Sequence, residues 1–412
     1  MLVSDDPSFG GVPRLAESLR RVWLECDLGR GPAAILAAGL EELRTDHQSG
    51  ARQLAGKALE ILRDVIVALD ESETHDAWWA KVRGTAWHLW KNGRESMGAA
   101  ILSVLLGALK STEDTLRLHD EQPGAKESKQ RRDAVVENLQ KRITSRANVT
   151  TNPVSETLIK FLDDEFGERA KAASLSIMTL SESSTISSCL EDIVRRTDFA
   201  IDLRVLESRP LFEGVSLAAA FADNVLSGDS AKGKPDREDS PTRFKVTIFT
   251  DAAAAMAAQG IDIVLLGADR IASSGSVSNK TGSLPVVLSA KHVSPKVKTV
   301  VLGETEKIAP PGDEKEHIVE NNDPAQLVRS WRSDFNSDRV QHAAATFSKA
   351  LGHSGLGDAS SVQLVVSNIF FEWVPHSLVD FYVTEFGLWT RKDILEHSQQ
   401  LEVEQQRLFG DI

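Results

Sequence analysis

The chain has 412 residues, enough to bury one large core or two ordinary ones. Its formal net charge of −13 argues against general binding to nucleic acids or anionic membranes, which require a basic surface. The two cysteines, Cys26 and Cys189, cannot form a disulfide framework, and the ten histidines lack the spacing of a zinc site, so we expect neither a metal nor another cofactor.

The first residues, MLVSDDPSFGG, have neither the cationic start nor the apolar core of a secretory signal. No apolar run approaches the roughly 20 residues needed to span a bilayer. We therefore expect a cytoplasmic protein without a membrane segment.

The first part of the chain has the apolar spacing of helices. In the segment 51–70, apolar residues recur every three to four positions, as expected for one buried helix face. Similar patterns predict helices near 12–26, 31–46, 74–91, 95–110, 128–147 and 153–170. Residues 1–170 are thus expected to form an all-helical N-terminal domain.

From Ser174 the pattern changes to short β-branched runs that alternate with helical segments. This alternation predicts a mainly parallel, doubly wound sheet in a Rossmann-like α/β domain over residues 171–412. Polar insertions are expected near 228–243 and 305–360, the second with one or two helices. Strands are expected at 174–180, 199–206, 244–249, 261–266, 298–303 and 362–368. The expected fold class is α+β: a helical domain followed by an α/β domain.

Asp269 and Lys280 follow the apolar run 261–266, separated by a Gly/Ser-rich loop that also contains Asn279. Ligands of open parallel sheets bind beyond the carboxyl ends of the strands. This location would present an acid/base candidate and a phosphate-sized cation at one crevice. The alternative is that Asp269 caps a turn and pairs with Arg270.

Two further strand ends carry polar residues. Ser181, Ser183 and Ser184 lie where the strand 174–180 meets the next helix, and hydroxyls and backbone N–H groups at a helix start favour phosphate. The alternative for Ser183 or Ser184 is simple N-capping. Glu207 and Arg209 follow the strand 199–206; Arg209 could hold phosphate in a bidentate fork, or form only a surface pair with Glu207.

All these motifs are expected at the same edge of one sheet, where they would form a sugar-phosphate pocket. A further element lies in the helical domain, at Gly93-Arg94. Gly93 interrupts the helical pattern, so a turn there could offer backbone donors and a guanidinium across a cleft. A plain interhelical turn is the alternative.

The ordered set TLSESS, ESRPLFEG, DAAAAM, GADRI, VSNKTGS and EWVPHSLVDFYVTEFG resembles one superfamily. It is similar to the regulatory alpha, beta and delta subunits of translation initiation factor 2B. Their enzyme relatives are methylthioribose-1-phosphate isomerase and ribose-1,5-bisphosphate isomerase. The resemblance covers residues 174–303 and 362–395 and implies a helical domain on a Rossmann-like domain, with dimerisation through the latter.

The resemblance also indicates which residues would distinguish an isomerase from a regulatory subunit. The isomerases place a cysteine directly after Thr-His at the end of the first α/β strand and pair it with the aspartate of GAD. Here the aspartate is Asp269, but the three positions are Thr179, Leu180 and Ser181. A serine hydroxyl is far less acidic than a thiol, and Cys189 lies about two helical turns further on. The isomerases' phosphate-loop arginine is replaced by Asn92, with Arg94 or Arg83 as possible substitutes.

Two functions follow from this resemblance. The preferred one is a regulatory and assembly module in translation initiation that binds a phosphorylated sugar or nucleotide, as a homodimer or a hetero-oligomer with related subunits. The alternative is an aldose-ketose isomerase of a sugar 1-phosphate that uses Asp269. Neither function involves direct binding to nucleic acid or to a membrane.

Overall fold

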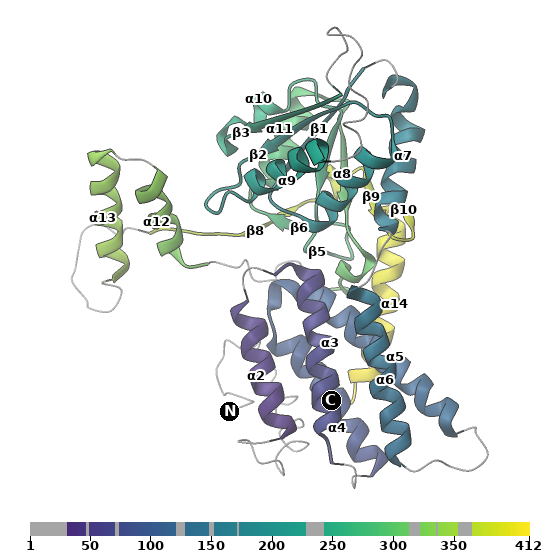
Figure 1. The fold of residues 1–412 in the computed structure, drawn as a ribbon. Coiled ribbons are helices and arrows are strands. Elements are labelled where there is room, and N and C mark those ends of the chain that lie inside the picture. Colours follow the sequence, from purple (N-terminus) through teal and green to yellow (C-terminus); the bar gives the residue numbers. More distant parts are fainter. Residues whose placement is uncertain are drawn as a thin grey trace.

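The structure is a computed structural model that describes residues 31–46, 49–70, 74–120, 128–147, 152–170, 173–227, 243–312, 322–334, 337–352 and 365–412. Figure 1 shows a helical part below and an α/β part above. The described helices of the helical part are α2 (Pro32–Thr45), α3 (Ala51–Ala68), α4 (His75–Asn92), α5 (Gly98–Asp120) and α6 (Ser128–Ala147). The predicted helix at 12–26 and Cys26 lie outside the described residues.

The helical part has its own apolar core. Leu54, Ala58, Leu62 and Val65, one predicted face of α3, are all buried there at 1% exposure or less. Thr74 begins α4 by accepting the N–H of Ala77 through its hydroxyl. Among the described helices, none is both long and apolar enough to cross a bilayer.

Two further helices pack against the sheet or connect it to the helical part (Figure 1). Helix α7 (Pro153–Ala170) packs on the sheet, where Leu158 and Phe161 join the core of its strands. Helix α14 (Arg391–Phe409) runs from the α/β part into the helical part, and its last residues, Leu408 and Phe409, are buried in the helical core.

The α/β part is built on a seven-stranded sheet of order β10-β9-β7-β4-β1-β2-β3. All neighbours pair in parallel except β9 and β10, which form an antiparallel pair. Its strands are β1 (Leu175–Leu180), β2 (Ile201–Leu206), β3 (Phe244–Phe249), β4 (Ile263–Leu266), β7 (Lys298–Leu302), β9 (Phe381–Thr384) and β10 (Gly387–Trp389). The helices between them are α8 (Ser184–Arg196), α9 (Glu213–Ser227), α10 (Ala254–Ala257) and α11 (Ser283–Val293).

The strand order reverses beside β1. The chain runs from β1 outward to β2 and β3, then returns to place β4 on the other side of β1. Such a switch point opens a crevice at the carboxyl ends of the two central strands. The predicted fold class, a helical part followed by a mainly parallel, doubly wound α/β part, is therefore confirmed.

A second, antiparallel sheet was not expected from the sequence. It has the order β5-β6-β8, formed by β5 (Arg270–Ile271), β6 (Val277–Lys280) and β8 (Phe371–Val374). Asn279 and Lys280 lie on β6, so the expectation that they belong to a loop beyond the run 261–266 is wrong. Pairing with β8, about 90 residues later in the chain, fixes them there.

The predicted strand 362–368 is also wrong in its described part, because residues 365–368 form no strand. Asn368 instead bonds to the start of the second insertion: its carbonyl accepts the N–H of Asn322, and its amide donates to the carbonyl of Asp323. This contact forms the neck of a helical hairpin, α12 (Pro324–Asp334) and α13 (Asp338–Gly352), which stands away from the body in Figure 1. The one or two helices expected in 305–360 are thus confirmed.

A short 3-10 helix, η5 (Thr305–Lys307), follows β7 and packs against the helical part. Arg146, near the end of α6, donates from both terminal nitrogens to the two carboxylate oxygens of Glu306, each at 2.6 Å. Both side chains are largely buried, at 21% and 13% exposure. The pair therefore fixes η5 to the helical part in a bidentate geometry.

We predict that Arg146→Ala lowers the free energy of unfolding by about 3 kcal/mol, because it leaves the Glu306 carboxylate buried without its partner. Urea unfolding of the purified protein measures the loss. The double variant Arg146→Met/Glu306→Leu should regain a large part of it, since no charge then remains buried. A double variant as unstable as the single one would contradict this account.

Candidate functional site

The switch point brings together residues from the ends of β1 and β4. Gly267, just after β4, has no side chain, and a Cβ there would lie 3.1 Å from the Ser183 hydroxyl and 3.5 Å from the Asn279 Oδ1. Gly267 thus allows the β1 end, the β4 end and β6 to approach closely. Two predicted site residues, Ser183 and Asn279, meet at this point.

Asp269 lies beside them, two residues beyond Gly267. Its backbone N–H donates to the carbonyl of Ser278 on β6, which fixes the loop. The residue keeps some solvent exposure, yet protein atoms crowd its carboxyl group. Desolvation raises the pKa of Asp269 above its ordinary value, and the negative charge of Glu213 adds to this shift.

Three cations oppose the shift. The charges of Lys307, Lys280 and Arg94 each act to lower the pKa of Asp269, but desolvation outweighs them. Lys307 belongs to η5, Lys280 to β6, and Arg94 to the turn after α4. The carboxyl group is therefore faced by positive charge from both parts of the molecule.

Lys307 is buried at 6% exposure, as is Arg94. Burial acts to lower the pKa of its ammonium, but the carboxylates of Glu304 and Asp269 raise it on balance. Glu304 lies 3.3 Å from the Lys307 Nζ. Burial opposes ionisation of Glu304, yet the charge of Lys307 and further hydrogen bonds bring its pKa down to about 2.

The serines at the β1 end have different surroundings. Ser181 is buried with a positive φ of 62°, and its backbone N–H donates to the Ser208 hydroxyl. Ser183 caps α8, accepting the N–H of Ile186, as the simpler interpretation expected. Ser184 is exposed in the first turn of that helix. Phosphate binding by these serines stays a prediction.

Cys189 does not supply a reactive thiol. It is fully buried in the apolar core between α8 and the sheet, where the Ser155 hydroxyl contacts its sulfur at 3.4 Å. Desolvation raises the pKa of this thiol to about 12, so it stays protonated at neutral pH.

Glu207 and Arg209 form the ion pair that was the alternative to phosphate binding. The Arg209 Nε donates to the Glu207 carboxylate at 2.9 Å, and the guanidinium also lies over the ring of Phe212. Backbone N–H groups of Ser208 and Arg209 donate to Asp251. With its side chain 44% exposed, Arg209 is at the rim of the crevice.

The turn after α4 reaches the site from the helical part. Gly93 ends the helix where a Cβ would lie 2.5 Å from the Leu89 carbonyl oxygen, so only glycine fits this turn. Arg94 is buried at 6% exposure and donates to the carbonyl of Asp46 at 2.8 Å. Arg83, the other candidate, pairs with Asp411 near the C-terminus. Arg94 is thus the arginine whose charge reaches Asp269.

Sequence reasoning did not single out Lys307 or Glu213. Lys307 lies in GETEKI, directly beyond β7, which is one more strand end at the same sheet edge. Glu213 is the second glutamate of ESRPLFEG and forms an ion pair with Lys280 at 2.8 Å. Extending the strand-end argument to β7 would have found Lys307, whereas nothing in the local sequence distinguishes Glu213 from an ordinary acidic residue at a helix start.

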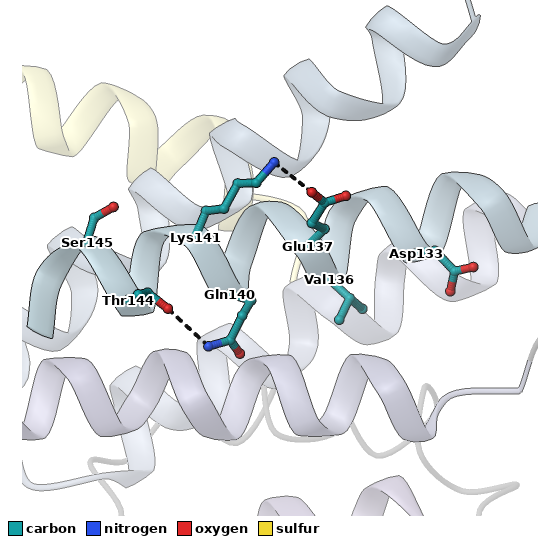
Figure 2. A pocket seen from close by; sticks show the side chains of 7 residues that line it. All are labelled: Asp133, Val136, Glu137, Gln140, Lys141, Thr144 and Ser145. Carbon is teal, nitrogen blue, oxygen red and sulfur yellow. Dashed lines mark hydrogen bonds and ion pairs between the residues drawn. The ribbon is translucent and has the colours of Figure 1, made fainter. Parts of the chain in front are cut away.

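A groove of about 520 Å³ lies elsewhere, along α6 (Figure 2). It is lined by residues of that one helix: Asp133, Val136, Glu137, Gln140, Lys141, Thr144 and Ser145. Within it, Lys141 pairs with Glu137 at 2.7 Å. The groove shares no residue with the crevice. Among the described residues, no cluster of three His, Cys, Asp or Glu side chains could hold a metal.

We predict that Asp269→Asn raises the melting temperature at pH 7. A carboxyl whose pKa is raised on folding contributes stability below its ordinary value of 3.8, and this contribution is lost as the pH rises through the folded-state value. The gain over the wild type should therefore shrink towards pH 4. Calorimetry at both pH values measures it, with the exposed Asp164→Asn as control. A gain equal at both pH values would contradict the assignment.

Comparison with known proteins supports the predicted family. Residues 242–391 match the initiation factor 2 subunit family. A methylthioribose-1-phosphate isomerase of Zea mays is 28% identical over 194 residues, which cover 45% of this chain and 45% of that protein. The chain thus matches less than half the length of such curated relatives.

Solved structures share the fold. A chain of the tetrameric eIF2B-beta2-delta2 complex from Chaetomium thermophilum superposes with a TM-score of 0.55 at 13% identity, covering 95% of this chain and 99% of that one. The 5-methylthioribose 1-phosphate isomerase of Pyrococcus horikoshii superposes with a TM-score of 0.52 at 17% identity, covering 89% and 87%. The resemblance predicted from the motifs is therefore confirmed: residues 242–391 match the initiation factor 2 subunit family, and the chain is similar to isomerases over less than half of its length.

Proposed function

We propose that the crevice binds a small sugar 1-phosphate and converts the aldose to the ketose, with Asp269 as a proton-transfer group. The observation that carries this proposal is a partly accessible carboxyl group with a raised pKa, faced by three cations. A carboxyl group whose pKa is raised holds its proton more readily than an ordinary aspartate, so it is better suited to donate as well as accept a proton in general acid-base catalysis. The curated relatives named as isomerases favour this function over the regulatory one that the serine at position 181 suggested.

The cations would bind the phosphate group of the ligand. Lys280 and Arg94 approach Asp269 from opposite parts of the molecule, so a phosphorylated sugar would bridge them across the crevice. Lys307 is held by Glu304 and Asp269 in the interior. It is suited to stabilising negative charge that develops on the substrate rather than to the first capture of an anion.

We predict that the purified protein converts methylthioribose 1-phosphate or ribose 1,5-bisphosphate to the ketose, as followed by NMR. Asp269→Asn should lower kcat by about 100-fold or more, because it removes the proton-transfer group. The matched control is Asp164→Asn, an exposed carboxylate on α7 that pairs with Lys160. Absence of turnover by the wild type on both substrates at high protein concentration would reject this function.

Binding can be tested apart from turnover. In the Asp269→Asn background, a sugar 1-phosphate at about 100 times its Kd should stabilise the native state by about 2.7 kcal/mol and raise the melting temperature. Lys280→Met should abolish this rise, and Arg209→Met at the rim should reduce it. Lys141→Met on α6 serves as control. An unchanged rise in both the Lys280 and the Arg209 variant would refute the pocket.

A second function is favoured by one observation, the serine in place of the isomerases' cysteine. We propose as the alternative a regulatory module of the initiation factor 2B type that binds the same ligand class without turnover. It would associate with itself or with related subunits, as the chain of similar fold does in the eIF2B-beta2-delta2 complex. Ligand-induced stabilisation without turnover, together with co-purification of translation-factor subunits, would support it.

A further inference from the structure

Glu213 is the first residue of α9 and lies directly over the end of β2. The chain approaches so closely there that a Cβ on the next residue, Gly214, would lie 1.8 Å from the carbonyl oxygen of Leu206. The N–H of Gly214 also donates to the carbonyl of Glu207. Glycine is thus required at position 214, and the close approach brings the Glu213 carboxylate to the crevice rather than to the outer surface of the helix.

One ammonium group connects Glu213 to Asp269. The Lys280 Nζ donates to Glu213 Oε1 at 2.8 Å, with side-chain exposures of 14% and 23%. The same ammonium lies over the ring of Phe370 at 4.6 Å, which limits its movement. Its charge also acts on Asp269, as does that of Glu213. Lys280 is thus paired with Glu213, and both lie close enough to Asp269 for their charges to act on its carboxyl group.

The simpler explanation makes Glu213 only a counterion of Lys280. Acidic residues are common in the first turn of a helix, where the dipole favours them. A counterion, however, opposes the capture of a phosphorylated ligand, because its charge repels the anion and occupies the lysine. A carboxylate that weakens ligand binding at this position is better explained by a role in the reaction.

The reaction needs a second proton-transfer group beside Asp269. The isomerases that the sequence resembles use a thiol, but Ser181 holds that position here, and a serine hydroxyl is a weak acid and a poor base. Cys189 is buried in the α8 core. Glu304 is engaged by Lys307 and by the Thr185 hydroxyl. Among the described groups that act on Asp269, Glu213 is the remaining carboxylate that is partly accessible to a ligand.

We propose that Glu213 is the catalytic base that replaces the thiol, working with Asp269 as the acid; this inference rests on the proposed isomerase function. Asp269 gives its proton to the ring oxygen of the sugar 1-phosphate, and the bond from C1 to that oxygen breaks. The Glu213 carboxylate takes the proton from C2, and a C1–C2 double bond forms. Glu213 then returns the proton to C1 while the Asp269 carboxylate takes the proton of the C2 hydroxyl, leaving a C2 carbonyl. Both groups end as they began, and no oxidant or reductant is needed.

The test uses the full-length protein and Glu213→Gln, which keeps the shape of the side chain but cannot accept the proton. We expect kcat on the sugar 1-phosphate to fall by about 100-fold or more. Inorganic phosphate, measured by calorimetry, should bind more tightly than to the wild type, because the amide no longer competes for Lys280. A merely structural role would weaken binding and turnover together. Glu191→Gln, on α8 and paired with Arg195, is the matched control.

Turnover in D₂O gives an independent readout. A base that exchanges its proton with solvent leaves deuterium at C1 of the ketose, whereas a direct hydride shift from C2 does not. Deuterium at C1 with the wild type, together with the loss of turnover in Glu213→Gln, supports the proposal. A Glu213→Gln variant with wild-type turnover, or a ketose free of deuterium, overturns it and leaves the isomerase function intact. A wild type without turnover overturns both.

Discussion

The structure depends on the burial of charged groups where its two parts meet. Lys307 is buried at 6% exposure, and its charge is balanced by Glu304 and Asp269. The same 3-10 helix carries Glu306, which Arg146 holds from the helical part. Removing either Arg146 or Glu306 alone leaves a buried charge without a partner, which is among the more costly defects in a protein. The positive charge that acts on Asp269 in the crevice therefore comes from both the helical and the α/β part.

Two carboxyl groups near Lys307 are shifted in opposite directions. Glu304 has a pKa of about 2, because it receives the lysine and hydrogen bonds directly, whereas desolvation dominates for Asp269 and raises its pKa. The same lysine thus acts on one carboxylate that stays ionised and on one carboxyl group that is harder to ionise. This division is a common way for a protein to assign different roles to chemically similar groups. The desolvation that suits Asp269 to the proposed proton transfer also makes its ionised form destabilising in the folded protein.

Much of this arrangement could be predicted from local sequence patterns. The spacing of Leu54, Ala58 and Leu62 predicted a buried helix face, and the alternation of apolar runs with helical segments predicted the parallel sheet. The carboxyl ends of β1, β2 and β4 carry polar residues that local reasoning identified, because parallel strands must end at the same edge. The proposed ligand roles of these residues depend on their contacts, which local patterns do not contain.

The incorrect predictions result from contacts between segments that lie far apart in the sequence. Lys280 lies on β6 because β8, about 90 residues later, pairs with it, and no local pattern distinguishes that strand from a loop. The apolar segment 362–368 has the composition of a strand, but its described residues form the neck of the α12–α13 hairpin through Asn368. Glu213 was hidden for a different reason. An acidic residue at a helix start is ordinary, and only the close packing of Gly214 on β2 places it at the crevice.

Glu213 also bears on the choice between the two functions. A module that only senses a phosphorylated ligand gains affinity from every cation it leaves free for the anion. This chain instead occupies Lys280 with a carboxylate at 2.8 Å and confines it against Phe370. The cost in affinity is understandable if the carboxylate takes part in a step that follows binding, since catalysis is favoured by interactions that strengthen in the transition state rather than in the bound ground state. The absence of the isomerases' thiol and the presence of this second carboxylate are then two parts of one change, in which a carboxyl pair takes over the transfer of protons.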